Sequence, residues 1–578
     1  MNIGIGIEIK TWQVMTVIDS KHIPKSKFLI AKGRGSIVEA SARAFPALAA
    51  KFWDMLQKAF AMDLRPLKRL ASLVFLLLAA AGCQKKVKPD IPPQTSLPVV
   101  TASTNTEHET PTPSPEPQSY AEYHATLDIF PKERKIIGVE KVIYVNSTGD
   151  ELSELRFNAY LAAYAKDSTQ KPYPPEAVKK VMRYGEDYSQ LKIGELSVNE
   201  EHVETELTGT SLRVILKRPL SPGERIEVRF EIEAYIPAIN ARTGGSPGQI
   251  WCGNFFPMLA VYENGEWRSD PCYNVGDPFY TRTSNFTVSV TAPLEYEIIG
   301  TGSSKVAEHV EKKTTTFTAK LVRDFAFAVS ADYKEHVRQT SEGVDIDFYA
   351  FSDLEKPEGI LDMAERALAY FGDLAGPYPY NRLVLVEAGL PYYNAMEYSQ
   401  LIFLDSDFLN EAEQYSDIAH EIGHQWFYNI IGSDQVNNAW MDEGLVAFLK
   451  DGMFLTREEQ ELAARSEHER IKAISPEISG SALSSSLGEY KNWAEYHDIQ
   501  FGKGKLLFHS LRNKMGDSSF LAFLKLYYQT YSFKIASPQN MIDAASAASG
   551  MELDEFFNGW IYNRDMPELV LDPIVQAN

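Results

Sequence analysis

Two histidines and two glutamates in one stretch of this chain have the types and spacing of a catalytic metal site. His420, Glu421 and His424 form an H-E-x-x-H pattern, and Glu443 follows the second histidine after eighteen intervening residues. Residues four apart lie one above the other on a helix, so both imidazoles can face one metal ion. Zn²⁺ binds histidine nitrogen and carboxylate oxygen, and a catalytic site keeps a fourth position for water. We therefore predict one Zn²⁺ ion held by His420, His424 and Glu443, with Glu421 as general base.

The alternative is an ordinary amphipathic helix whose histidines are satisfied by carboxylates. In a chain of this composition an H-E-x-x-H pattern arises by chance on the order of one or two per cent of the time. Here the distant Glu443 stands in a W-M-D-E-G segment, residues 440–444. A third carboxylate at a ligand-compatible separation favours the metal site over the accidental pattern.

Length and charge narrow the class of protein. The 578 residues suffice for two or three domains, and 44% hydrophobic with 23% charged residues is ordinary for a globular protein. A formal charge of −21 argues against nucleic acid as a partner, because phosphate contacts need an excess of lysine and arginine. The composition does not indicate an oligomeric state.

The N-terminal region contains a secretory pattern. A basic flank at 62–69 precedes the apolar run Leu70–Gly82, which ends at Cys83. Such a run is too short to span a bilayer comfortably, and it resembles the signal of bacterial lipoproteins. We predict a lipoprotein-type signal peptide at 62–83 whose lipidated Cys83 anchors the protein to the membrane, outside the cytoplasm. Residues 1–61 then fit an upstream extension from a mis-assigned start codon; a cytoplasmic segment before an internal anchor is the alternative.

The remaining sequence divides into a tether and two folded parts. Residues 84–119 are rich in Pro, Thr and Ser and predict a semi-extended linker. We place a β-rich domain at 120–335 and a peptidase domain at 336–578. Cys252 and Cys272 can form a disulfide in an oxidising compartment or remain two core thiols.

Hydrophobic periodicity separates the two folded parts. Five segments between 120 and 335 alternate apolar and polar residues and predict strands: 123–130, 141–147, 212–218, 224–236 and 285–293. Downstream, helical spacing predicts helices at 361–376, 504–516, 520–531 and 553–564. The strand 382–389 and the segment 394–405 stand between the first of these helices and the metal motif.

A second motif connects the chain with a known family. In the sequence Asn394-Ala395-Met396-Glu397-Tyr398, the three inner residues resemble the G-x-M-E-N exopeptidase motif of the aminopeptidase N family of gluzincins. That family also has H-E-x-x-H, eighteen residues, and a glutamate within W-x-x-E-G. The resemblance implies that Glu397 binds the free α-amino group of a peptide, with Ala395 and Met396 beside it. A carboxylate near the metal can pair with an ammonium and so select chain ends.

The resemblance covers about residues 120–578. The segments 255–280, 501–516 and 556–569 are similar to the family's β-domain closing segment, its helix after the zinc helices and its W-to-P ending. It implies an α+β multidomain fold, in which a β-rich saddle or sandwich domain precedes a thermolysin-like, mostly helical catalytic domain.

One position departs from the family. A tyrosine normally precedes the [E/G]-K-G triplet and stabilises the oxyanion, whereas this chain has Phe501. A phenyl ring cannot donate that hydrogen bond, and loss of one oxyanion donor costs about 10²- to 10³-fold in rate. Tyr496 is our candidate for the catalytic hydroxyl, with Tyr398 and His497 as alternatives.

These features together predict a zinc metallopeptidase acting on peptides with a free N-terminus, an aminopeptidase. Two alternatives remain open. The altered positions Asn394 and Tyr398 allow an endopeptidase or another amide hydrolase, and Phe501 allows a catalytically weak, zinc-containing peptide-binding lipoprotein.

Overall fold

The computed structural model describes residues 2–9, 12–19, 27–32, 36–41, 119–354, 356–409, 414–478 and 480–570. The predicted signal peptide and almost all of the predicted linker lie outside these residues. The chain divides into two compact units, Met1–Pro111 and Thr112–Asn578.

The first unit contains an antiparallel sheet of four strands in sequence order. They are β1 (Asn2–Ile9), β2 (Trp12–Asp19), β3 (Lys27–Lys32) and β4 (Ser36–Ser41). Our assignment of residues 1–61 to a mis-assigned start stays a prediction.

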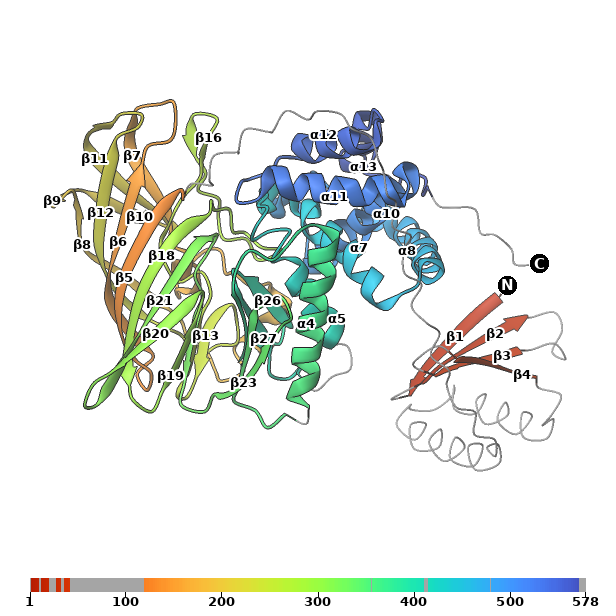
Figure 1. The fold of residues 1–578 in the computed structure, drawn as a ribbon, viewed down its shortest axis with the longest axis horizontal. Coiled ribbons are helices and arrows are strands. Elements are labelled where there is room, and N and C mark those ends of the chain that lie inside the picture. Colours follow the sequence, from red (N-terminus) through yellow and green to blue (C-terminus); the bar gives the residue numbers. More distant parts are fainter. Residues whose placement is uncertain are drawn as a thin grey trace. The chain divides into compact units, whose positions relative to one another are not determined.

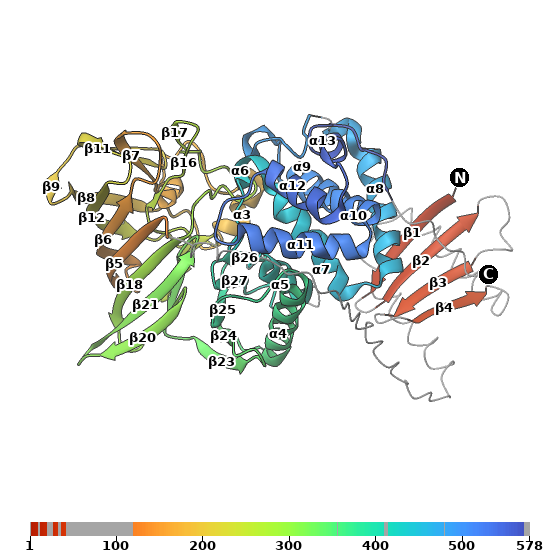
Figure 2. The same ribbon diagram turned by 45° about the horizontal axis from the view of Figure 1, so that its top comes forward.

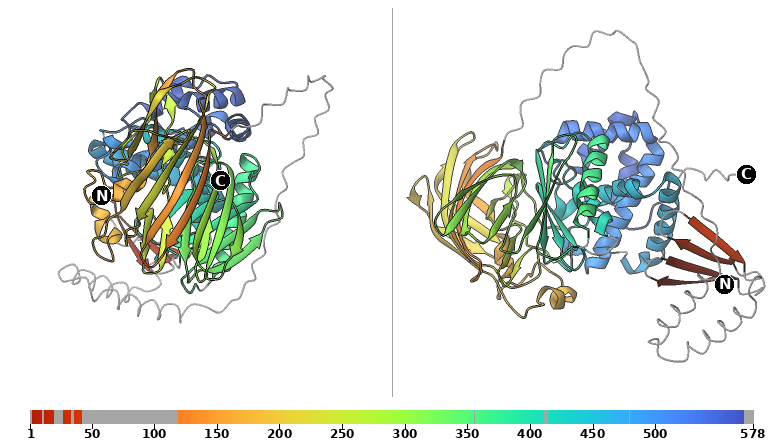
Figure 3. Two further views of the ribbon diagram at one scale, coloured as in Figure 1. Left: turned by 90° about the vertical axis from the view of Figure 1, so that its left-hand side faces the viewer. Right: turned by 60° about the horizontal axis from the view of Figure 1, so that its bottom comes forward.

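An eight-stranded sheet dominates the β-rich part of the second unit (Figure 1; Figure 3, left). Its order is β20 (Ser303–Glu308), β21 (Lys312–Val322), β18 (Ser284–Pro293), β5 (Ala121–Phe130), β6 (Lys135–Val145), β12 (Arg225–Tyr235), β8 (Gln190–Val198) and β9 (Glu201–His202). Alternate side chains of β5 are buried, as the period-two pattern of the sequence predicts. Four of the five segments predicted as strands lie in this sheet, and the fifth, 212–218, is a strand of another sheet.

Smaller sheets complete the β-rich part. One has the order β10 (Thr205–Thr208), β11 (Ser211–Leu220), β7 (Leu152–Asn158) and β15 (Met258–Leu259). Another has the order β13 (Thr243–Ser246), β14 (Gln249–Cys252), β22 (Phe327–Ser330) and β19 (Glu297–Gly300), and β16 (Tyr262–Glu263) pairs with β17 (Glu266–Trp267). Their inner faces share one apolar core with the large sheet. Cys252 and Cys272 are both buried and free, so they do not form a disulfide.

A mixed five-stranded sheet carries the segment before the metal motif. Its order is β23 (Lys334–Gln339), β24 (Asp345–Ala350), β25 (Arg382–Ala388), β27 (Leu401–Asp405) and β26 (Ala395–Tyr398). The predicted domain boundary at 335/336 therefore falls inside β23. Helix α4 (Pro357–Leu374) packs beside this sheet (Figure 1). Among the described strands β26 pairs with β27 alone and is an edge strand.

Helices make up most of the C-terminal part, as the sequence predicts (Figure 2). They are α5 (Gln414–Gly423), α6 (Gln435–Asn438), α7 (Glu443–Phe454), α8 (Arg457–Ile478), α9 (Trp493–His497), a π-helical turn (Asp498–Lys503), α10 (Gly504–Met515), α11 (Asp517–Tyr531), α12 (Pro538–Ser549) and α13 (Asp554–Ile561). Together with the β-rich part, this confirms the predicted α+β multidomain class.

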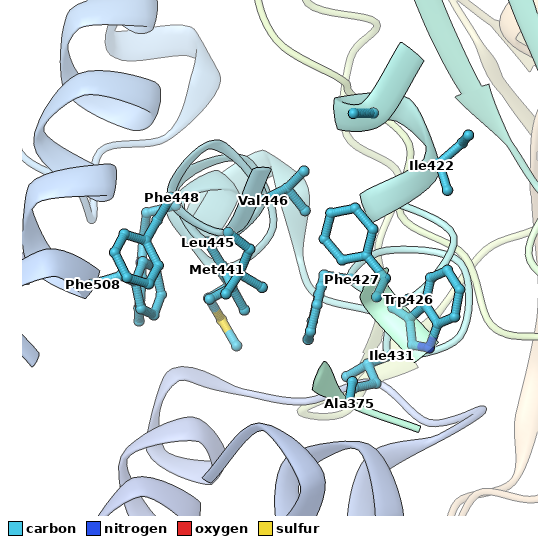
Figure 4. Packing of buried hydrophobic residues seen from close by; sticks show 14 of the residues in the cluster. Ala375, Ile422, Trp426, Phe427, Ile431, Met441, Leu445, Val446, Phe448 and Phe508 are labelled. Atoms are coloured by element: carbon cyan, nitrogen blue, oxygen red, sulfur yellow. The ribbon is translucent and has the colours of Figure 1, made fainter. Parts of the chain in front are cut away.

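A continuous apolar core holds the two metal-motif helices in place. Figure 4 shows Ile422 and Trp426, from α5 and the turn after it, in the same apolar cluster as Leu445, Val446 and Phe448 of α7, with Phe448 on the side of Phe508. These side chains are at most 3% exposed. Because interiors are densely packed, this contact sets the spacing between the helix that carries the histidines and the helix that carries Glu443. Among the described helices, none combines the length and the apolar character that a membrane span requires.

Candidate metal centre and active site

Helices α5 and α7 bring the three predicted zinc ligands together. The two Nε2 atoms of His420 and His424 are 3.0 Å apart, and Glu443 Oε2 lies 3.1 Å from the first and 3.3 Å from the second. All three ligand atoms lie within 4.8 Å of one another, and the residues are buried. The i, i+4 spacing and the packing of α7 on α5 thus place nitrogen, nitrogen and oxygen around one point.

A backbone carbonyl fixes the tautomer of one ligand. His424 Nδ1 donates a hydrogen bond to the carbonyl oxygen of Phe427, 3.1 Å away. This leaves Nε2 with its lone pair directed toward the other ligand atoms, the arrangement in which a second partner orients a metal-binding histidine. No sequence pattern marks this partner, because it is a main-chain atom.

Burial and neighbouring charges tune the ligands. Burial lowers the pKa of His420 well below its ordinary value, so this ring is neutral, as a metal ligand must be. Burial acts the same way on His424, but the carboxylates of Glu397, Asp442 and Glu421 outweigh it and raise the pKa. Burial also raises the pKa of Glu443. A buried cluster of two imidazoles with several carboxylates fits a divalent cation, and this donor set fits Zn²⁺.

Glu443 is held at the first turn of α7 by its neighbours. Asp442 caps the helix by accepting a hydrogen bond from the backbone N–H of Glu443, and it also accepts one from Gln435 Nε2, 2.6 Å away. These two hydrogen bonds of Asp442 therefore help to position Glu443. A close helix crossing adds to this, because a Cβ on Gly444 would lie 2.8 Å from the Cα of Gly504 in α10.

Glu421, the predicted general base, is buried and lies under the influence of other carboxylates. Its Oε2 is buried and has no hydrogen-bond partner among the described residues. Burial raises its pKa well above the ordinary value, and Glu397 adds to the effect. Asp417, one turn earlier on α5, accepts a hydrogen bond on Oδ2 from Asn394 Nδ2, 3.3 Å away.

The second motif forms edge strand β26, whose two faces differ. Glu397 shares a face with Ala395, and its carboxylate lies in the same charged environment as Glu421 and His424. Met396 lies on the opposite face, where it packs in an apolar cluster with Trp251. Alternation along a strand produces this division. Of the three predicted substrate-binding residues, the structure therefore puts the side chains of Ala395 and Met396 in two different apolar clusters, and the carboxylate is that of Glu397.

Glu397 is influenced by residues that the sequence did not single out. Burial raises the pKa of Glu397 to about 7, and Asp277 from the β-rich part contributes to the rise. Asp277 is itself paired with the buried Arg242, whose Nη2 lies 2.6 Å from Oδ1. Asn429 Nδ2 also donates a hydrogen bond to the carbonyl of Glu397. No local pattern marks these residues, because tertiary folding alone brings them to the site.

The structure separates the candidates for the oxyanion donor. The Phe501 ring stacks on His420 at 5.6 Å and on His497 at 4.9 Å between centroids, so it lies between the two histidines. Tyr398 shares the face of Met396, with its hydroxyl packed against Gly253. The hydroxyl of Tyr496 is buried without a described partner; burial raises its pKa well above the ordinary value, and the charge of Glu443 adds to the rise. Tyr496 thus remains our candidate.

The part of the chain that carries the metal-binding group is similar to known proteins. Residues 360–560 match the model of the Peptidase family M1 domain. Leukotriene A-4 hydrolase of Xenopus laevis is 27% identical over 218 residues, covering 35% of this chain and 36% of that protein. Aminopeptidase N of Lactobacillus delbrueckii subsp. lactis is 24% identical over 297 residues, 46% of this chain and 33% of that protein. This chain thus spans about a third of the length of the curated relatives it matches.

A solved structure shares the fold over most of its length. The M1 zinc metallopeptidase from Deinococcus radiodurans aligns with a TM-score of 0.58 at 19% identity, covering 79% of this chain and 96% of that one. The fold is that of this zinc metallopeptidase, and the His420, His424 and Glu443 group is a ligand set of the gluzincin type. The segment 360–560 is thus similar to the peptidase family M1 domain, and the relatives that the chain matches include aminopeptidase N.

Proposed function

We propose that this chain is an aminopeptidase that removes N-terminal residues from peptides. The observation that carries the proposal is the common environment of Glu397, Glu421 and the three ligands, on strand β26 and helices α5 and α7. The curated relatives include proteins named as aminopeptidases, which supports the same activity.

Each polar group of the site then has a role in peptide hydrolysis. A Zn²⁺ ion held by His420, His424 and Glu443 supplies Lewis acidity, which lowers the pKa of water and polarises a carbonyl. Glu421 takes the proton of the attacking water on its unpartnered Oε2 and returns it to the leaving amine. Tyr496 donates its hydroxyl hydrogen to the carbonyl oxygen that gains charge.

Strand β26 orients the peptide. The carbonyl of Asn394 accepts a hydrogen bond from Asp405 N in β27's ladder, so the main-chain groups of Ala395, the next residue, point away from β27. Asn429 and Gln425 occupy the carbonyls of Glu397 and Tyr398, so an extended peptide can pair with the main-chain groups of Ala395, and such pairing with a strand edge is a common mode of peptide recognition. Glu397 at the other end of the strand pairs with the α-ammonium, and cleavage is limited to the first residue.

The test is an assay on the zinc-loaded protein. We expect Glu421→Gln to retain zinc and lose turnover of aminoacyl arylamides by at least about 10³-fold, because both proton transfers pass through this carboxylate. The matched control Asp417→Asn, one turn away on the same helix, should keep turnover within a few-fold. Bound zinc is measured in each variant.

Specificity for the chain end needs a second comparison. We expect N-acetylated peptides to be cleaved much more slowly than free ones, because acetylation removes the ammonium that pairs with Glu397. Equal cleavage of both would support the endopeptidase or amide-hydrolase alternative. Zinc binding without turnover in the wild type would support the peptide-binding alternative.

We also propose that the protein is held outside the cytoplasm by a lipid on Cys83. The support is the sequence alone: a basic flank, an apolar run and a small residue before the cysteine. We expect Cys83→Ser to move the protein out of the membrane fraction. Retention of this variant in the membrane would contradict the anchor.

A further inference from the structure

A basic pocket of about 380 Å³ lies next to the start of strand β26. Asn394, the residue before the strand, lines it. Three cations line it from α3 (Val178–Val181) and the turn that follows: Lys179, Lys180 and Arg183. The whole chain has a formal charge of −21, so a pocket with three positively charged side chains differs from the mostly acidic molecule.

Two hydrogen bonds that link the β26 segment with the α5 segment show where the pocket lies relative to Glu421. Asn394 contacts Asp417 near the start of α5, and Gln425, after the end of α5, donates a hydrogen bond to the carbonyl of Tyr398. Strand and helix therefore run alongside each other in the same direction. Glu421 lies one helical turn after Asp417 and one turn before Gln425, so it stands between the two contacts.

This order sets the course of a bound peptide, on the basis of the proposed function. A peptide with its ammonium on Glu397 and its scissile bond at Glu421 must continue toward Asn394. An extended chain advances about 3.3 Å per residue, so the three positions from Glu397 to Asn394 correspond to about 10 Å. The third or fourth residue of the substrate then reaches the pocket.

The pocket has more positively than negatively charged side chains. Asp405 and Asp407 also line it. Arg183 is paired with Asp407 at 3.0 Å, while Asp405 accepts two backbone N–H groups. Lys180 donates one hydrogen bond to a backbone carbonyl, and Lys179 has no hydrogen bond or ion pair among the described contacts. The two lysines thus remain available to an anion.

We propose that this pocket binds a carboxylate of the substrate downstream of the scissile bond, through Lys179 and Lys180. The implied substrates are short peptides whose third or fourth residue carries a carboxylate, either as the C-terminus or as an Asp or Glu side chain. Ammonium–carboxylate hydrogen bonds are stronger than neutral ones, although solvent exposure of the lysines reduces the gain.

The experiment compares tri- and tetra-alanine as free acids with their C-terminal amides. We expect the wild type to favour the acids by about 3- to 10-fold in kcat/KM, and Lys179→Gln/Lys180→Gln to reduce this ratio to near one. The control Lys132→Gln/Lys320→Gln removes the same charge from exposed positions of the β-rich part and should keep the ratio. Amidated peptides with Asp third or fourth distinguish a side-chain carboxylate from the C-terminus.

A binding measurement separates this proposal from the proposed function. Calorimetry of the same acid and amide peptides with zinc-loaded Glu421→Gln does not depend on turnover. A preference for acids without any turnover in the wild type keeps the pocket and refutes the aminopeptidase. Equal binding of acid and amide, or loss of the preference in the control as well, overturns the pocket. Should the lysine variant fail to fold, the wild-type preference must still weaken as salt rises, and a salt-independent ratio overturns the proposal.

Discussion

At the scale of single residues, Tyr496 has a buried hydroxyl without a described partner, and the charge of Glu443 adds to the rise of its pKa. We expect Tyr496→Phe to lower kcat by about 10²- to 10³-fold with little change in KM or bound zinc, because the hydroxyl acts in the transition state while the ring keeps its packing. Steady-state kinetics on an aminoacyl arylamide measures this effect.

The matched control is Tyr490→Phe. The Tyr490 ring packs against Tyr496 at 5.4 Å, but its own hydroxyl donates to the carbonyl of Ala482. We expect kcat of this variant to stay within a few-fold of the wild type. If Tyr496→Phe were fully active while Phe501→Tyr raised kcat, the oxyanion donor would be missing from the natural chain.

At the scale of elements, the crossing of α7 and α10 depends on two glycines. A Cβ on Gly444 would lie 2.8 Å and 2.9 Å from backbone atoms of Gly504, which cannot move without shifting α10. We expect Gly444→Ala to lower the free energy of unfolding by about 1–3 kcal/mol and to weaken zinc binding, because Glu443 is the adjacent residue. Chemical denaturation and zinc titration measure the two effects.

Gly559→Ala in α13 is the control, since nothing lies within 4 Å of the added Cβ. It should stabilise the protein by about 0.5–1 kcal/mol, because alanine loses less backbone entropy than glycine in a helix. A Gly444→Ala variant as stable as this control would show that the helices can separate without loss.

At the scale of elements, the sequence predicts the metal ligands and most strands but not their partners in the folded chain. Local spacing predicts the ligands His420, His424 and Glu443 and most strands, because four-residue and two-residue periods are properties of the backbone. The partners Phe427 and Asp277 could not be predicted, since one acts through its main chain and the other arrives from the β-rich part. The burial of the Met396 side chain could not be predicted either, because it depends on which face of β26 packs against the core.

At the scale of the whole molecule, a buried carboxyl in β6 links stability to pH. Glu140 is fully buried, neither oxygen has a described partner, and burial raises its pKa well above 4.5. The folded protein keeps this proton while the unfolded chain releases it above about pH 4.5. Stability is therefore complete below that pH and falls, by up to about 1.4 kcal/mol per pH unit, until the folded pKa is reached.

We expect Glu140→Gln to remove this decline, so that its stability relative to the wild type increases from pH 5 to pH 8. Denaturant titrations across that range measure the slope. The exposed Glu122→Gln on neighbouring β5 is the control and should follow the wild type. Parallel pH profiles for Glu140→Gln and the wild type would contradict the assignment.

Strand β26 has one more consequence, for association between copies of the protein. An open sheet edge is a template on which a second chain can add a strand and begin an aggregate. This edge has four residues, and Asn394 before it and Gln400 after it both have left-handed backbone conformations, with φ of 65° and 58°. Both ends therefore turn out of the extended path. A four-residue edge that turns away at both ends offers few main-chain groups to a second sheet, which limits association through this strand.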